Sequence, residues 1–73
     1  MARKMKEADL AEVMAIENRC FSVPWSEHIF REILDAKEYI CLVEEAAGRI
    51  VGYAVLLLIG EEGDIANIAV HPE

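Results

Sequence analysis

Residues 50–59 read Ile-Val-Gly-Tyr-Ala-Val-Leu-Leu-Leu-Ile, and this apolar stretch decides the fold class of the 73-residue chain. It is too short to cross a bilayer as a helix, and its β-branched residues favour a strand. Because it is apolar at odd and even positions alike, it is typical of a central strand that is covered on both faces. We therefore predict a sheet with this strand near its middle.

Turns and further strands are predicted on each side of this segment. Ala-Gly-Arg at 47–49 and Gly-Glu-Glu-Gly at 60–63 have the composition of tight turns. Beyond them, residues 38–44 and 64–70 are rich in strand-forming residues. The three strands and two turns together predict two consecutive hairpins.

Two amphipathic helices are predicted ahead of the hairpins. Within residues 8–20, apolar side chains recur at near-helical spacing, and Glu17 falls among the polar residues between them. Pro24 then breaks the helix, because proline removes a hydrogen-bond donor and restricts the residue before it. Ser26 is a good N-cap for a second helix that runs to about residue 36.

A short strand over residues 2–5 completes the predicted order β-α-α-β-β-β. This is an α/β (α+β) fold with a mainly antiparallel sheet and two helices. A chain of 73 residues allows one small domain, whose core rarely supplies more than about 3–5 kcal/mol, yet 55% of its residues are hydrophobic. We therefore expect that a partner or a missing half covers part of the sheet.

The charge balance and the cysteines limit the function classes. Seven Lys and Arg residues against 14 Asp and Glu give a net charge of −7, which argues against nucleic acid or an anionic membrane as partner. A cationic partner such as a protonated amino terminus would be attracted. Cys20 and Cys41 lack C-x-x-C spacing and have apolar neighbours, so both are predicted to be buried free thiols. No apolar run of signal-peptide type follows the charged N-terminus, which predicts a soluble, cytoplasmic protein.

Three polar residues are candidates for carrying chemistry. His28 and His71 lack the several convergent ligands that a zinc or Cys–His site needs, so no metal site is predicted. Asn67 lies in an otherwise apolar strand and must be hydrogen-bonded if it is buried. It could support a local distortion of the strand or face water, and the sequence leaves both open.

Three stretches of the chain resemble the GNAT superfamily and, within it, the ribosomal-protein alanine N-acetyltransferases. They are Met-Lys-Glu-Ala-Asp-Leu at 5–10 with Ile-Glu at 16–17, Cys-Phe-Ser-Val-Pro-Trp-Ser-Glu at 20–27, and Gly-Tyr-Ala at 52–54 with Ile-Ala-Asn-Ile-Ala-Val-His-Pro-Glu at 65–73. The combination of Pro-Trp-Ser with Asn-Ile-Ala-Val is more specific to the protein N-terminal subgroup than either motif alone. The resemblance implies direct, metal-free acetyl transfer from acetyl-CoA to the N-terminal amine of a basic ribosomal protein, with alanine as the acceptor residue.

The same resemblance implies where acetyl-CoA would bind. By match to the family's fourth strand, main-chain groups of Ile68, Ala69 and Val70 would bond the acetyl group and pantetheine. Ile68 and Val70 would at the same time be ordinary alternating core residues of that strand.

The resemblance also implies which residues meet the substrate. Phe21, Ser22, Pro24 and Trp25 match the loop that shapes the groove for the substrate's N-terminus. Trp25 is equally well explained as a core residue that anchors this loop, since tryptophan is often buried for packing alone.

The resemblance covers essentially all 73 residues but only about the first half of the family's usual length. The pyrophosphate-binding loop, the general-base glutamate and the general-acid tyrosine would follow, so no catalytic residue is predicted here. We expect residues 1–73 to be the N-terminal part of a single GNAT domain that is inactive alone. The alternative is a small non-catalytic binding module. In either case the uncovered sheet face and the edge of residues 65–70 predict a homodimer.

Overall fold

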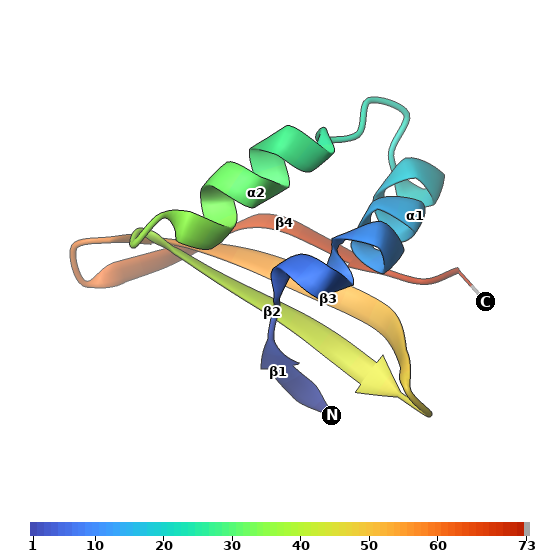
Figure 1. Cartoon of the computed structure of the whole chain (residues 1–73). Coiled ribbons are helices and arrows are strands. Elements are labelled where there is room, and N and C mark those ends of the chain that lie inside the picture. The colour runs from blue at the N-terminus through green and yellow to red at the C-terminus, as the bar shows by residue number, and fades with distance from the viewer. Residues whose placement is uncertain (73) are drawn as a thin grey trace.

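Four strands and two helices make up the fold in a computed structural model that describes residues 1–72. In chain order the elements are β1 (Ala2–Lys4), the 3-10 turn η1 (Glu7–Asp9), α1 (Leu10–Cys20), α2 (Glu27–Asp35), β2 (Tyr39–Ala46), β3 (Arg49–Ile59) and β4 (Glu62–Val70). The strands form one antiparallel sheet in the order β1-β2-β3-β4. Both helices lie on the same face of this sheet (Figure 1). The predicted element order and antiparallel sheet are confirmed.

The helix boundaries follow from local hydrogen bonds. The Ser26 hydroxyl oxygen accepts from the amide of Ile29 at 3.2 Å, which is the N-cap that the sequence predicted for α2. The first helix begins later than predicted, at Leu10, because the preceding residues form η1. There the carboxylate of Asp9 accepts from the amide of Lys6 at 2.8 Å and pairs with Arg3 of β1. No helix in the described part of the chain is long and apolar enough to cross a membrane.

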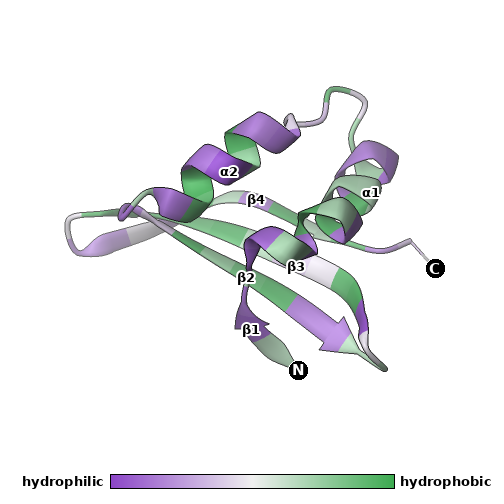
Figure 2. Cartoon of the chain, in the orientation of Figure 1, coloured by the Kyte–Doolittle hydropathy of each residue, from purple (hydrophilic) through white to green (hydrophobic). Residues whose placement is uncertain are grey.

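The core lies between the helix pair and the sheet. Phe30 of α2 is fully buried, and its ring meets Tyr53 of β3 edge-on with centroids 5.9 Å apart. Figure 2 shows hydrophobic colouring along β3 and on the sides of the helices that overlie the sheet. The other side chains with almost no exposure are Leu10, Val13, Ile16, Glu17, Val43 and Val55.

The face of the sheet opposite the helices has no cover among residues 1–72. Ile65, Ile68 and Val70 of β4 are 60%, 55% and 70% exposed, and Leu58 near the end of β3 is exposed as well. The prediction that part of the sheet is left uncovered is confirmed, whereas the placement of Ile68 and Val70 in the core is wrong for this chain. The reason is that α1 and α2 pack on the same side (Figure 1).

A bulge interrupts the pairing of β3 with β4. Val55 lies opposite Asn67 and Leu56 lies opposite Ile65, which leaves Ala66 without a partner on β3. Bulges of this kind bend the strand and change the direction in which neighbouring side chains point. The distortion lies directly before the Asn-Ile-Ala-Val segment of β4.

Candidate functional site

A buried carboxylate lies where α1, the loop after it and the last two strands meet. Glu17 is 1% exposed. Its Oε1 accepts hydrogen bonds from the Asn67 amide at 2.9 Å and from the Tyr53 hydroxyl, and its Oε2 accepts from the main-chain amide of Trp25 at 2.8 Å. Burial raises the pKa of Tyr53 well above its ordinary value, and the hydrogen bond to Glu17 raises it further. This hydroxyl therefore stays protonated and donates.

The burial of Glu17 corrects the sequence prediction, which had placed it among the polar residues of the first helix. Glu17 follows Leu10 by seven positions and Val13 by four, and these spacings put all three on one face of a helix. The helical spacing alone would have placed Glu17 on the buried face, but charged residues are usually exposed, so the residue type favoured the polar face. Tyr53, its hydroxyl donor, was also missed, because an apolar strand gave no sign of a polar partner.

The loop between the helices carries the four residues that were predicted to contact substrate. Phe21 and Trp25 are half-buried and pack against the core, Pro24 is half-buried, and Ser22 is exposed. The Trp25 ring lies 5.4 Å from that of Phe30. Trp25 also borders a groove of about 400 Å³ whose other lining residues are Ile29, Glu32, Ile33, Ala36, Tyr39 and Ala66. Trp25 therefore packs on the core and also borders an open groove.

The three residues that were predicted to bind acetyl-CoA lie at the end of β4, the last strand of the sheet. The amide of His71 donates to the carbonyl of Val51 on β3 at 2.7 Å. Main-chain groups alternate in direction along an antiparallel strand, so those of Ala69 also face β3, whereas those of Ile68 and Val70 point away from it. A hydrogen bond to Cys20 is consistent with this outward direction, because the Cys20 thiol donates to the carbonyl of Val70 at 3.6 Å.

The two cysteines differ in their surroundings. Cys41 is buried, as predicted, and burial raises the pKa of its thiol. Cys20 is exposed, which corrects the prediction that both thiols are buried. The difference arises because Cys20 ends α1 beside the edge of the sheet, whereas Cys41 lies inside β2.

An apolar hollow of about 220 Å³ adjoins these residues on the open face of the sheet. Leu42 and Ala54 line it together with Ile68, Ala69 and Val70. The outward main-chain groups of β4 and the hollow together could hold a ligand that is apolar in part and carries amide or carbonyl groups.

Asn67 is paired, which settles what the sequence left open for this residue. Its side-chain amide donates to Glu17, directly beside the bulge at Ala66. Asn67 is therefore held by Glu17 at a position next to the distortion of β4. Across residues 1–72, no three His, Cys, Asp or Glu side chains converge as metal ligands would, and the exposed His28 pairs with Glu32 at 2.9 Å.

Comparison with known proteins identifies the family of the chain. A model of the acetyltransferase (GNAT) family matches residues 10–73. The chain belongs to this family. A protein of Bacillus subtilis (strain 168), described as a candidate ribosomal protein bS18-alanine N-acetyltransferase, is 33% identical over 72 residues. That match covers 97% of this chain and 48% of the Bacillus protein.

Solved structures show the same relationship at the level of the GNAT fold. The ribosomal-protein-S18-alanine N-acetyltransferase of Escherichia coli superposes with a TM-score of 0.86 at 26% identity, over 99% of this chain and 46% of that one. A ribosomal-protein-alanine N-acetyltransferase of Brucella melitensis gives 0.75 at 21% identity, covering 99% and 54%. An aminoglycoside 6'-N-acetyltransferase of Acinetobacter haemolyticus gives 0.79 at 16% identity, covering 99% and 57%, and shows the fold alone.

The GNAT resemblance found in the sequence is thus confirmed, and the fold corresponds to the N-terminal part of a GNAT domain. The chain spans about half the length of the relatives that it matches.

Proposed function

We propose that the protein to which this chain belongs transfers an acetyl group from acetyl-CoA to the N-terminal amine of a protein. Its substrate would be a basic ribosomal protein that begins with alanine, modified in the cytoplasm. The observation that carries the proposal is the end of β4, where the main-chain groups of Ile68 and Val70 point away from the sheet beside an apolar hollow. The similarity to the Bacillus protein favours this substrate class over a small molecule.

The end of β4 is suited to the acyl donor. Attack on a thioester requires a deprotonated amine, a hydrogen-bond donor for the carbonyl oxygen and a proton for the leaving thiolate. An outward amide of Ile68 or Val70 would supply the second of these, whereas the amide of Ala69 faces β3. The apolar hollow would accept the aliphatic part of pantetheine. We assign neither proton transfer to a residue of this chain.

The loop between the helices is suited to the acceptor peptide. Pro24 restricts the loop, Trp25 borders the 400 Å³ groove, and Phe21 fixes the beginning of the loop on the core. Ser22 is exposed and free to contact a peptide main chain. Glu32 lies in the same groove, and its charge would favour a protonated amine, as does the net charge of −7.

A chimera tests the proposed function. Residues 1–73 would replace the matching 46% of the E. coli enzyme, and acetylation of an alanine-starting peptide would be followed by mass spectrometry. We expect acetylation of the free N-terminus and none of a peptide whose N-terminus is blocked. The 73-residue chain alone should show no turnover, because loss of a general acid or base costs about 10²–10⁴-fold each.

The controls of this experiment are acetyl-CoA binding and cooperative unfolding of the chimera. A folded chimera that binds acetyl-CoA but does not acetylate the peptide would contradict the proposal. The result would then favour the second candidate, a non-catalytic binding module, for which the open apolar face of the sheet is the supporting observation.

A further inference from the structure

We propose that Glu17 is a positioning residue whose buried carboxylate holds the loop of residues 21–25 and the end of β4 in one fixed arrangement. The significance of this for acetyl transfer rests on the proposed function, because these two segments are the acceptor and donor sides of the proposed site. The positioning itself is a property of the chain without ligands.

Glu17 holds both ends of the loop. At its start, the amide of Phe21 donates to the main-chain carbonyl of Glu17 at 3.1 Å. At its end, the amide of Trp25 donates to Oε2 of the same residue at 2.8 Å. Pro24 has no amide hydrogen, so the Trp25 amide is the first main-chain donor after it. One residue of α1 therefore fixes where the loop leaves the helix and where it returns.

Glu17 also holds the end of β4 through its other carboxylate oxygen. Oε1 accepts from Asn67, which is 50 residues away in sequence and lies between the bulge at Ala66 and Ile68. It accepts as well from Tyr53, which pairs with Ala69 across the β3–β4 ladder. The bulge, the outward direction of Ile68 and the loop thus share one hydrogen-bonding centre.

A buried charge contributes little to stability, which favours a role for Glu17 in positioning its hydrogen-bond partners. Removing a carboxylate from water is costly, and apolar side chains of similar volume often stabilise a core as well or better. The fully buried neighbours in this core, such as Val13, Phe30 and Val55, are apolar. Unlike a leucine side chain, a carboxylate has two oxygens that can accept several hydrogen bonds from different directions.

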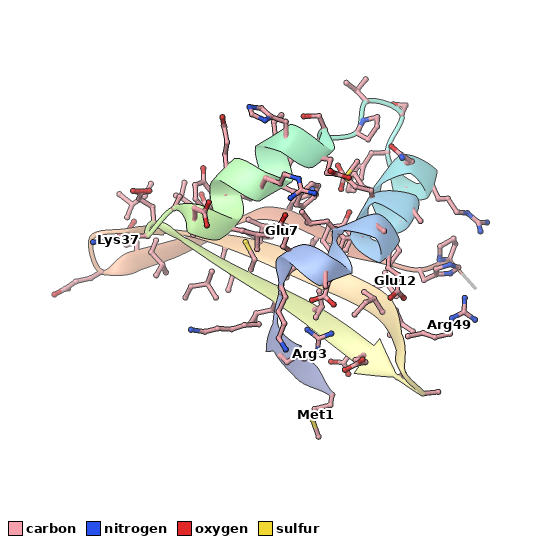
Figure 3. All side chains as sticks on the ribbon, viewed as in Figure 1. Met1, Arg3, Glu7, Glu12, Lys37 and Arg49 are labelled. Carbon is pink, nitrogen blue, oxygen red and sulfur yellow. The ribbon has the colours of Figure 1, made fainter. Side chains whose placement is uncertain are left out.

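The test compares two identical substitutions on the same helix. Glu17→Gln leaves one acceptor oxygen, which we expect to stay with the two donors of Oε1, Asn67 and Tyr53. The amide group then replaces Oε2, so the hydrogen bond from Trp25 is lost. Glu12→Gln is the matched control, because Oε2 of Glu12 also accepts a main-chain hydrogen bond, from Ile50 at 2.9 Å, far from the loop. Figure 3 shows Glu12 near the end of the sheet that carries Arg49.

Amide hydrogen exchange of the unliganded 73-residue chain is the measurement. We expect Glu17→Gln to accelerate exchange at Trp25 by about 10- to 100-fold relative to Val43 in β2, which is the effect of one lost hydrogen bond to a charged group. Trp25 is the single tryptophan, so its emission should shift in the same variant. Glu12→Gln keeps an acceptor oxygen for its single contact with Ile50, so it should leave both Trp25 signals unchanged.

Asn67→Ala tests the β4 side without touching the carboxylate, and covers the case in which Glu17→Gln fails to fold. It should accelerate exchange at Ala69 about tenfold and leave Trp25 protected. The proposal is overturned if Trp25 exchange is unchanged in Glu17→Gln, if all amides accelerate by one common factor, or if Asn67→Ala leaves Ala69 unaffected. No acetyl-CoA or peptide enters the measurement, so this result is independent of whether the proposed function holds.

Discussion

At the residue scale, the chain buries two carboxylates among residues 1–72 and stabilises them in different ways. Asp9 forms a bidentate ion pair with the Arg3 guanidinium, with N–O distances of 2.8 and 2.9 Å. It also accepts a hydrogen bond from the amide of Lys6. Glu17 instead accepts from the neutral donors of Trp25, Tyr53 and Asn67. Figure 3 shows Arg3 on β1, so the first pair joins the edge strand to the turn that precedes α1.

The Asp9 pair predicts a defined response to acid. The hydrogen bond to Arg3 lowers the pKa of Asp9 below its ordinary value despite the opposing effect of burial. A lowered folded-state pKa contributes stability that is present above the ordinary pKa and is lost as the pH falls through the folded one. Asp9→Asn should therefore be less stable at pH 7 by about 1–3 kcal/mol and lose less stability below about pH 4 than the parent.

Urea unfolding between pH 7 and pH 2 measures this difference. Asp64→Asn is the control, because Asp64 is exposed on β4. Equal pH dependence in the parent and in Asp9→Asn would contradict the assignment.

Tyr53→Phe isolates one hydrogen bond of the Glu17 centre. The substitution keeps the ring that packs on Phe30 and removes the hydroxyl that donates to the carboxylate. We expect the free energy of unfolding to fall by about 1–3 kcal/mol, as for a hydrogen bond to a charged group. Tyr39→Phe, at a half-buried tyrosine against the same core, should change it by less than about 0.5 kcal/mol. Similar losses in the two variants would show that the hydroxyl of Tyr53 is not specially engaged.

At the element scale, the hairpin between β2 and β3 contains an unfavourable residue. Its two-residue turn has φ of 53° at Ala47 and 77° at Gly48, between the paired Ala46 and Arg49. Turns with two positive φ values match the twist of the strands, but they suit glycine or asparagine. The left-handed conformation costs an alanine about 1 kcal/mol or more.

Ala47→Gly should therefore raise the free energy of unfolding, by up to about 1 kcal/mol. The same change at Ala11, an exposed position of α1, should lower it by about 1 kcal/mol, because glycine is unfavourable in a helix. Thermal unfolding followed by circular dichroism measures both. A loss of stability in both variants would mean that the turn does not strain Ala47.

At the scale of the whole molecule, the helices leave one face of the sheet and the outer edge of β4 open. β4 is the last strand in the sheet, and Ile65, Ile68 and Val70 on it are more than half exposed. Exposed apolar side chains of this size each forgo about 1.5–3 kcal/mol of burial, and open edges pair with other strands. A two-fold axis is the commonest way for identical chains to cover such surfaces.

We therefore expect the 73-residue chain to form a homodimer through β4 and the open face. Sedimentation equilibrium at micromolar concentration should give twice the monomer mass of 8.2 kDa. Ile68→Lys should weaken the dimer by tenfold or more, about 1.4 kcal/mol, since it places a charge on the open face. Val23→Lys, at an 87% exposed loop position, should leave it unchanged. A parent chain that sediments as a monomer would contradict this expectation.

The sequence by itself determined the order of elements, the two hairpins, the Ser26 cap and the GNAT relationship, because periodicity, turn composition and motif spacing are local properties of the chain. It could also place Phe21 to Trp25 in one loop and Ile68 to Val70 on one strand. Only the tertiary structure decided which side of the strands the helices cover, that Glu17 is buried and that the thiol of Cys20 is not. These are consequences of burial, which depends on segments far apart in sequence. A strand that is apolar at every position does not specify which of its sides meets a helix, and a glutamate on a helical stripe is buried only where distant donors such as Asn67 satisfy its charge.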